Sequence, residues 1–169
     1  NGIPCHDVYT GFKWIADMVR RLGAEGYIGA GEESFGFMPG SFTRDKDGVS
    51  STSLMAEIAA WAKDNGKTLF GLLLEIYAEY GFSQEKMVYI VRKGLTGARE
   101  IQEMMHHFRH ETPATINGSA ILVKKDYADL TETDLTTGAT RAMDFPTTSD
   151  VLQFFLADGC KISVRPSGT

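Results

Sequence analysis

The sequence predicts an α/β plus α+β chain, with a mixed α/β part over residues 1–81 and a smaller α+β part over residues 82–169. In the first part, an amphipathic helix leads through glycines into a short apolar run and a glycine-rich turn. A boundary near residue 81 follows from a change of pattern, because helical stripes stop there and β-like runs begin. Near the end, Asp158-Gly159 separates two apolar runs and indicates an antiparallel hairpin.

Three helices are predicted in the first part. Apolar residues recur at helical spacing over Phe12–Leu22 and over Leu69–Tyr80, where Gly81 supplies a left-handed stop. Between them, a cluster of hydroxyl residues at 50–53 can cap a helix that runs through Ala62. A buried strand is predicted at residues 27–28. The methionine and aromatic residues at helical spacing are predicted to be core.

The second part is predicted to contain a β-like run at residues 88–91, a short helix at 101–108, a strand at 120–123 and a final hairpin of residues 151–156 and 161–164. Side chains alternate between the two faces of a strand. In the last strand, Cys160, Ile162 and Val164 therefore share the apolar side, and Arg165 emerges toward solvent beyond it, on the side of Lys161 and Ser163.

Composition excludes several classes of function. A formal charge of −5 argues against a nucleic-acid partner, because affinity for the phosphate backbone depends on clustered cations. The only cysteines, Cys5 and Cys160, lie far apart, which indicates a reducing compartment and thus the cytoplasm. No apolar run approaches membrane-spanning length, so no membrane partner is expected. The start at Asn1 and the stop at Thr169, within a polar loop, predict a chain cut at both ends.

Two short motifs carry polar groups that could bind a ligand. Residues 165–169, Arg-Pro-Ser-Gly-Thr, combine a guanidinium with hydroxyls and a glycine, which suits phosphate; the alternative is an ordinary surface turn. Residues 31–34, Gly-Glu-Glu-Ser, place two carboxylates and a hydroxyl after a strand. They can accept hydrogen bonds from sugar hydroxyls, hold a metal, or simply begin a helix. Gly29-Ala30-Gly31 also resembles the start of a dinucleotide-binding fingerprint, but it is discounted because position 34 is serine rather than glycine and no complete βαβ unit follows.

Two further groups are weaker. The loop Arg44-Asp45-Lys46-Asp47-Gly48 is either a solvated turn or the source of a mobile cation, Lys46, for a phosphate or sugar oxygen. His106 and His110 have the spacing of a metal pair, but no third ligand is evident, so an exposed helix face is the preferred interpretation.

Four motifs in order resemble the α-D-phosphohexomutases, the family of phosphoglucomutase and phosphomannomutase. They are residues 10–13 (Thr-Gly-Phe-Lys), 31–36, 44–48 and 165–169. The resemblance implies the later part of the family's α/β layered third domain at 1–81 and its smaller fourth domain, truncated, at 82–169. It assigns sugar contacts to Glu32, Ser34, Lys46 and Lys13. It assigns phosphate contacts to Arg165, Ser167, Gly168 and Thr169.

The implied activity is interconversion of hexose 1-phosphate and hexose 6-phosphate through a bisphosphate, using a phosphoserine, Mg²⁺ and a hexose bisphosphate activator. The family's serine and metal loops are not recognisable in residues 1–169, so the expected partners are a phosphorylated hexose and the missing amino-terminal domains. The chain alone is expected to be inactive. Two alternatives remain open, namely a non-enzymatic phosphosugar-binding module and a structural domain whose loops are mere turns.

Overall fold

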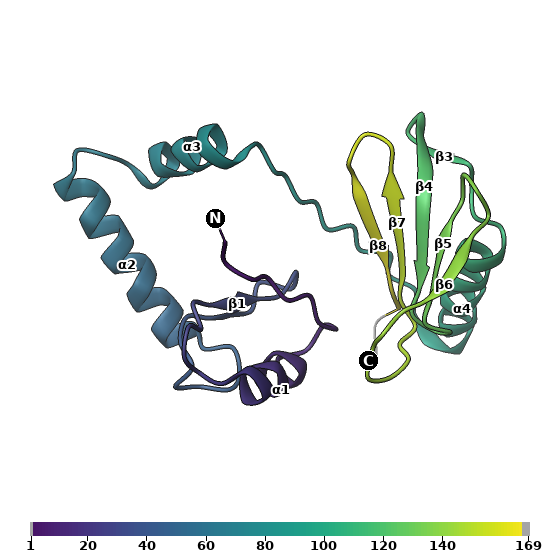
Figure 1. Cartoon of the computed structure of the whole chain (residues 1–169), viewed down its shortest axis with the longest axis horizontal. Helices are drawn as coiled ribbons and strands as arrows, with labels where there is room; N and C mark the ends of the chain where they lie inside the picture. Colours follow the sequence, from purple (N-terminus) through teal and green to yellow (C-terminus); the bar gives the residue numbers. More distant parts are fainter. Residues whose placement is uncertain (1, 167–169) are drawn as a thin grey trace. The chain divides into compact units, whose positions relative to one another are not determined.

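A computed structural model describes residues 2–166 of the chain, which divide into two compact units, residues 2–88 and 89–166. The first unit contains three helices and a pair of very short strands (Figure 1). In order these are α1 (Phe12–Leu22), β1 (Ala30–Gly31), β2 (Phe37–Met38), α2 (Gly48–Asp64) and α3 (Leu69–Tyr80). The predicted bounds of the first and third helices are confirmed.

The core of the first unit forms where α1 packs on the antiparallel β1–β2 hairpin. Phe12, Ile15 and Val19 lie on one face of α1 because their spacing follows the helical repeat, and they are buried with Met38 of β2. Tyr27 packs against this cluster and donates a 2.7 Å hydrogen bond from its hydroxyl to the Met38 carbonyl. This small core fixes the loop between β1 and β2 relative to the start of α1.

The predicted start of α2 needs a correction. Its cap is Asp47 rather than the cluster of hydroxyl residues at 50–53, because the Asp47 carboxylate accepts hydrogen bonds from the Val49 and Ser50 backbone amides at 3.0 and 3.4 Å. The helix ends at Asp64 and is followed by its C-cap, Asn65, and by Gly66 with φ of 67°. The following helix, α3, is capped by Thr68 and stops at Gly81 with φ of 97°.

The prediction that the methionine and aromatic residues at helical spacing are core is wrong for α2 and α3. No residue of α3 is buried, and Ala62 is the single buried residue of α2. The exposed fraction is 68% for Phe70 and 55% for Trp61. An apolar stripe is buried only where another surface covers it, and the described residues supply little cover over these two helices.

Two predicted strands are also absent. Residues 27–28 precede β1 without pairing, and residues 88–91 form no strand in the described part of the chain. Val88, Tyr89 and Val91 are each about 70% exposed, at 72, 71 and 69%. A run of β-branched and aromatic residues becomes a strand only when a partner strand pairs with it.

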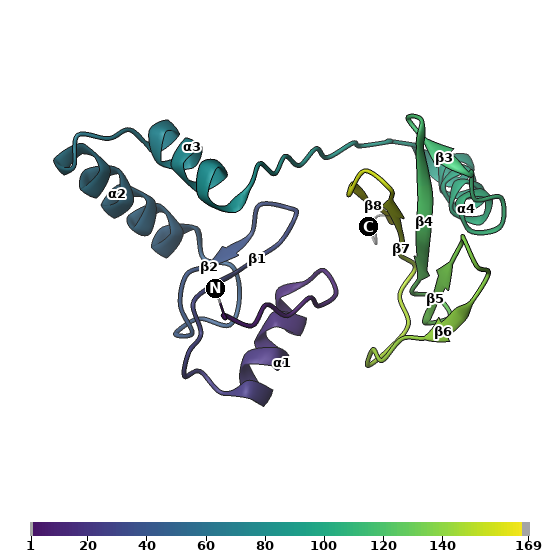
Figure 2. The same cartoon turned by 45° about the horizontal axis from the view of Figure 1, so that its top comes forward.

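The second unit is one helix, α4 (Gly94–His110), and six antiparallel strands (Figure 2). The strands are β3 (Thr115–Ile116), β4 (Ser119–Asp126), β5 (Thr131–Asp134), β6 (Thr140–Ala142), β7 (Leu152–Leu156) and β8 (Lys161–Val164). Their order is β6-β5-β4-β7-β8, with β3 paired to β4. The mixed fold class is therefore confirmed, although α4 and β4 are longer than predicted and β3, β5 and β6 were not foreseen.

The final hairpin is confirmed. Leu152 pairs with Val164 and Phe154 with Ile162, and the turn between the strands has Gly159 at φ of 85°. The Asp158 carboxylate accepts a 2.9 Å hydrogen bond from the Cys160 amide, which closes the turn. Ile162 and Val164 pack against the core as predicted. Cys160 is exposed instead, because it lies in the turn before the strand begins.

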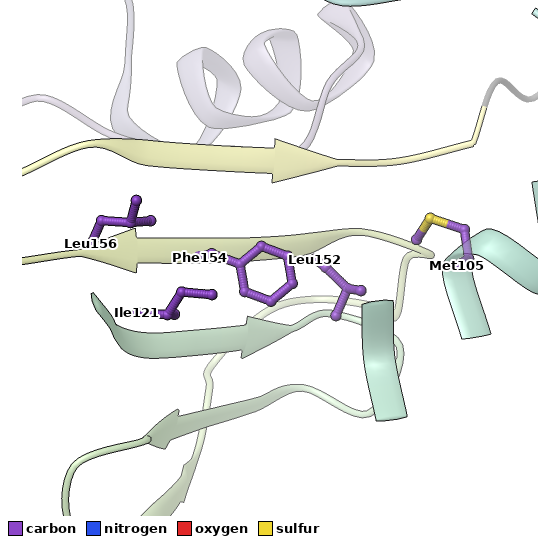
Figure 3. Close-up of a cluster of buried hydrophobic side chains, with 5 residues drawn as sticks. All are labelled: Met105, Ile121, Leu152, Phe154 and Leu156. Atoms are coloured by element: carbon purple, nitrogen blue, oxygen red, sulfur yellow. The ribbon is translucent and has the colours of Figure 1, made fainter. Parts of the chain in front are cut away.

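Alternation along β7 builds the core of the second unit (Figure 3). Leu152, Phe154 and Leu156 point to one face of the sheet, where they are buried with Ile121 of β4 and Met105 of α4. Leu152 and Phe154 are 0 and 1% exposed. The helix thus covers the same face of the sheet to which the hydrophobic side chains of β7 point.

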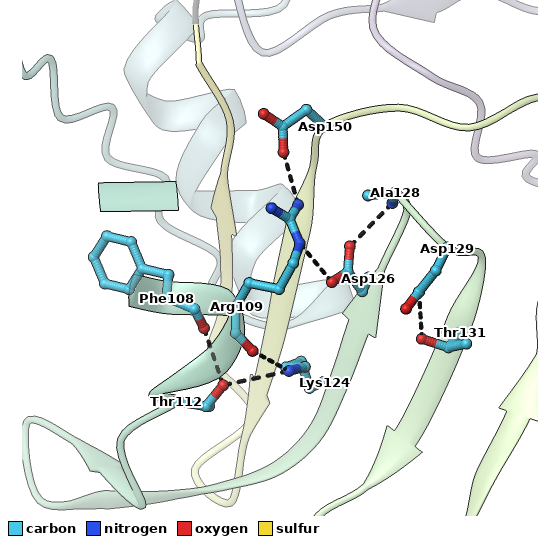
Figure 4. A network of polar contacts seen from close by, with 9 residues as sticks. All are labelled: Phe108, Arg109, Thr112, Lys124, Asp126, Ala128, Asp129, Thr131 and Asp150. Carbon is cyan, nitrogen blue, oxygen red and sulfur yellow. Dashed lines mark hydrogen bonds and ion pairs between the residues drawn. The ribbon is translucent and has the colours of Figure 1, made fainter. Parts of the chain in front are cut away.

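A polar network joins the end of α4 to the sheet (Figure 4). Arg109 donates a 2.7 Å hydrogen bond to each of Asp126, which is 3% exposed, and Asp150. Burial lowers the pKa of Arg109, but its hydrogen bonds to these carboxylates outweigh burial and raise that pKa overall. Lys124 donates a 2.7 Å bond to the Arg109 carbonyl, satisfying a free carbonyl at the helix end.

We expect Phe154→Ala to destabilise the second unit by about 3–5 kcal/mol, because a fully buried ring leaves a cavity. Urea unfolding followed by far-ultraviolet circular dichroism measures the loss. Phe155→Ala, on the half-buried opposite face, is the matched control and should cost about 1–2 kcal/mol. Trp14 and Trp61 both lie in the first unit, so their fluorescence transition should not move. Equal losses in the two variants would contradict the packing.

We expect Glu132 to stabilise the second unit only above acidic pH. Burial raises its pKa, but Arg141 and Lys125 outweigh burial and hold the pKa below the ordinary value of 4.5. A lowered folded-state pKa stabilises above pH 4.5, and this contribution is lost as pH falls through the lowered value. Glu132→Gln should therefore lower the free energy of unfolding by about 0.5–1 kcal/mol at pH 7 and have little effect near pH 3. Glu103→Gln, on an exposed helix face, should have little effect at either pH.

Candidate functional site

The β1–β2 hairpin presents a tight loop, residues 32–36, that carries the first predicted sugar contacts. The Glu32 amide donates a 2.9 Å hydrogen bond to the Gly36 carbonyl, and the Phe35 amide donates a 3.2 Å bond to the Glu32 carbonyl. Phe35 has φ of 67°, a conformation that bulky residues rarely adopt, and its side chain is 87% exposed. The loop is thus closed by hydrogen bonds within its own backbone.

Gly36 is the point at which the site is assembled. A methyl group at this position would lie 2.6 Å from the Phe12 ring, 3.0 Å from a Glu32 carboxylate oxygen and 3.3 Å from Cδ of Lys46. These three side chains come from α1, the hairpin loop and the loop before α2, so Gly36 marks where they meet. Only glycine leaves room for all three.

Lys46 is held in place by the loop that precedes α2. The Asp47 amide donates a 3.1 Å hydrogen bond to the Phe37 carbonyl, which fastens the loop to β2. The Lys46 ammonium lies 5.5 Å from the centre of the Phe12 ring and 3.3 Å from an Asp45 carboxylate oxygen. A 2.7 Å hydrogen bond from the Lys46 amide is the main cause of the lowered pKa of Asp45. Asp45 therefore stays ionised beside the ammonium.

The two adjacent glutamates of the loop have different partners. The Ser34 hydroxyl donates a 3.1 Å hydrogen bond to Glu32, so this hydroxyl and carboxylate form one unit. The Thr10 hydroxyl donates to both carboxylate oxygens of Glu33, at 3.1 and 3.3 Å. Glu33 thereby ties the loop to the segment before α1. The structure thus brings Glu32, Ser34 and Lys46 together.

Lys13 lies apart from this trio. It is exposed on α1, with its ammonium 5.2 Å from the Trp14 ring centre, and it lines a groove with Arg20 and Arg44. Within residues 2–166, no hydrogen bond or ion pair joins it to Glu32, Ser34 or Lys46. The predicted role of Lys13 in sugar contact stays a prediction.

The second predicted site follows β8. Arg165 is exposed directly after the strand. Two residues before it, the Ser163 hydroxyl accepts a 3.2 Å hydrogen bond from the side-chain amide of Gln153 across the hairpin. The side-chain carbonyl of Gln153 in turn accepts a 2.9 Å hydrogen bond from the Tyr127 hydroxyl. These contacts brace the polar face of the hairpin before Arg165. Ser167, Gly168 and Thr169 lie outside the described residues, so their predicted phosphate contacts stay predictions.

The described residues do not fit a metal ion. Over residues 2–166, no three or more His, Cys, Asp or Glu side chains come together as a ligand set. The rings of His106 and His110 lie 4.3 Å apart on α4 but gain no third ligand there. In the same part of the chain, no helix is both long and apolar enough to cross a membrane.

Comparison with known proteins relates the chain to one enzyme family. Residues 1–80 match the model of the phosphoglucomutase/phosphomannomutase family for its alpha/beta/alpha domain III. The part of the chain that carries Glu32, Ser34 and Lys46 is therefore similar to the third domain of that family. No solved structure matches the chain.

The similarity to phosphoglucomutases extends over the whole chain. The phosphoglucomutase of Staphylococcus aureus strain MRSA252 is 35% identical over 170 residues, which cover 100% of this chain and 30% of that protein. The phosphoglucomutase of Staphylococcus haemolyticus is 32% identical, covering 99% and 30%. The resemblance to the α-D-phosphohexomutases is confirmed, and the chain spans about 30% of the length of these relatives.

Sequence reasoning missed two residues that shape the site. Phe12 and Gly36 both stand in the quoted motifs, but neither was given a role. The one available signal was that Gly36 ends the Gly-Glu-Glu-Ser-Phe-Gly string, where a glycine can permit close approach.

We expect Gly36→Ala to disturb the site, because the added methyl group would meet the buried Phe12 ring at 2.6 Å. A clash of this kind typically costs about 1–3 kcal/mol. Gly48→Ala is the matched control, since nothing lies within 4 Å of its added carbon. Thermal unfolding followed by tryptophan fluorescence compares the two variants. A Gly36→Ala protein as stable as the Gly48→Ala protein would contradict the described packing.

Proposed function

We propose that the chain is the sugar-recognition and phosphate-recognition portion of a phosphohexomutase that interconverts hexose 1-phosphate and hexose 6-phosphate through a bisphosphate. The observation that carries this proposal is the meeting of Glu32, Ser34 and Lys46 around Gly36, in a unit that matches the family's third domain. The relatives are mutases by name, which supports the reaction class.

The chemistry of the trio suits a sugar. A carboxylate accepts hydrogen bonds from two neighbouring hydroxyls, and bonds to a charged group are worth about 1.5–3 kcal/mol each. Glu32 would accept these bonds while Ser34 keeps the carboxylate oriented through its 3.1 Å hydrogen bond. Lys46, held above Phe12, would supply positive charge to a ring or phosphate oxygen.

We assign the phosphate contact to Arg165, with Ser167, Gly168 and Thr169 completing the loop. A guanidinium meets two phosphate oxygens at once, which fixes the orientation of the ester as well as its position. With sugar hydroxyls held by Glu32 and the phosphate that does not react held by Arg165, either end of the hexose could be presented for phosphoryl transfer.

Phosphoryl transfer also needs a nucleophile and charge neutralisation. We propose that a phosphoserine and Mg²⁺ supply these in the whole enzyme, with a hexose bisphosphate as activator, and that this cytoplasmic enzyme holds both outside the described residues. The chain by itself would then bind substrate without turning it over. A mutase rate from the purified 169-residue chain, with bisphosphate and Mg²⁺, would contradict this division.

Calorimetric titration with glucose 1-phosphate tests the recognition sites. Glu32→Gln should weaken binding about tenfold, because the neutral amide loses a charge-assisted hydrogen bond. Arg165→Ala should weaken it by at least as much. The matched controls are Glu25→Gln and Lys161→Ala, which change exposed charges elsewhere in each unit and should leave affinity within about twofold. Absence of heat from the unmodified chain would instead favour loops that are mere turns.

A further inference from the structure

A second polar feature of the first unit is separate from the Glu32 loop. It is an open groove of about 360 Å³ between α1 and the loop before α2, lined by Lys13, Ala16, Asp17, Arg20 and Arg44. Three of these side chains are cationic and one is a carboxylate, whereas the whole chain has a formal charge of −5. We propose that this groove, named here the α1 groove, binds the phosphoryl group of a small phosphate dianion or phosphate ester.

Helix geometry explains why three of the side chains that line the groove lie together. Positions 13, 17 and 20 are spaced by four and three residues, so Lys13, Asp17 and Arg20 share one face of α1. Ala16 has a short side chain and leaves space between them. Arg44 reaches the same space from the loop that also carries Lys46. Two segments far apart in sequence therefore contribute cations to one groove.

Asp17 holds the guanidinium group of Arg20 in a defined orientation. It accepts hydrogen bonds from Nε and Nη2 of Arg20 at 3.2 and 2.6 Å, and its other oxygen lies 2.6 Å from Arg21. The hydrogen bond from Arg20 is the main cause of the lowered pKa of Asp17. One carboxylate is thus shared by two guanidinium groups, which leaves excess positive charge. Within residues 2–166, no hydrogen bond engages Nη1 of Arg20.

The other two cations have no carboxylate partner among residues 2–166. The Lys13 ammonium lies near the Trp14 ring, at 5.2 Å, rather than beside a negative group. Arg44 lies close enough to Tyr27 for its charge to oppose the rise in the Tyr27 pKa that burial causes. The Tyr27 hydroxyl is already occupied, since it donates to the Met38 carbonyl at 2.7 Å. Both Lys13 and Arg44 can therefore turn toward an anion in the groove.

This arrangement favours a compact dianion. Two guanidinium groups and an ammonium from different directions match the several oxygens of a phosphoryl group, which can accept bidentate bonds from arginine. A monovalent anion gains less from the same three charges, because Coulomb energy scales with the product of the charges. Nucleic acid is a poor occupant, since the chain is acidic overall.

Inorganic phosphate is the probe for the first test. In a Trp61→Phe background, Trp14 is the one remaining tryptophan, and its fluorescence should change as Lys13 turns toward the anion. We expect a saturating response to phosphate at constant ionic strength and none to chloride. Arg20→Gln and Arg44→Gln should each weaken phosphate binding about fivefold. A response that does not saturate would overturn the proposal.

Arg21→Gln is the matched control, because Arg21 pairs with the same Asp17 but does not line the groove. It should leave the affinity for phosphate within about twofold, since exposed charges outside a contact have weak effects. Asp17→Asn should tighten binding about threefold, because it removes the negative charge from the groove. Equal weakening by Arg20→Gln and Arg21→Gln would show a nonspecific charge effect and would overturn the proposal.

A third experiment distinguishes binding in this groove from binding at the proposed sugar site, and it identifies the source of the phosphoryl group. Glu32→Gln should leave binding of inorganic phosphate within about twofold while weakening glucose 1-phosphate, so either site can fail without the other. Comparison of inorganic phosphate with a hexose bisphosphate then distinguishes a free anion from an ester. Tighter binding of the bisphosphate that is lost in Arg44→Gln assigns the groove to an ester, whereas equal binding assigns it to the free anion.

Discussion

The absence of a side chain at Gly36 is the constraint on which the candidate site depends. Any larger residue would meet the Phe12 ring at 2.6 Å, and Phe12 is buried in the core that joins α1 to the β1–β2 hairpin. The same ring lies beneath the Lys46 ammonium, at 5.5 Å. Core packing and site geometry are thus one arrangement, because a single aromatic ring takes part in both. This explains how a very short hairpin can hold polar side chains in defined positions.

The second unit positions its predicted phosphate contact by a different means. Side chains alternate between the two faces of β7, so Leu152, Phe154 and Leu156 are buried on the face that α4 covers. Pairing with β7 then fixes the register of β8. The ion pairs of Arg109 with Asp126 and Asp150 fix the end of α4 to the sheet, at 2.7 Å each. Arg165 therefore follows a strand whose position is determined by a packed core, which suits its proposed contact with a phosphate.

The first unit combines a matched family domain with unusually exposed apolar helices. The family description names an alpha/beta/alpha domain, whereas residues 2–80 contain two strands of two residues each. The apolar stripe of α3 has no buried residue. Apolar side chains at helical spacing are typical of a helix face that packs against another surface. The described residues do not form such a surface over α3.

The sequence by itself determined the bounds of α1 and α3, the β7–β8 hairpin and the family, because helical periodicity, turn dipeptides and short motifs are local signals. It failed for residues 88–91 and for the burial of α3, since pairing and burial depend on partners distant in sequence. Only the tertiary structure decided that Glu33 accepts a hydrogen bond from Thr10 and that Lys13 lines a groove with Arg44. Contacts between segments more than 20 residues apart leave no periodic pattern, so a single sequence cannot reveal them.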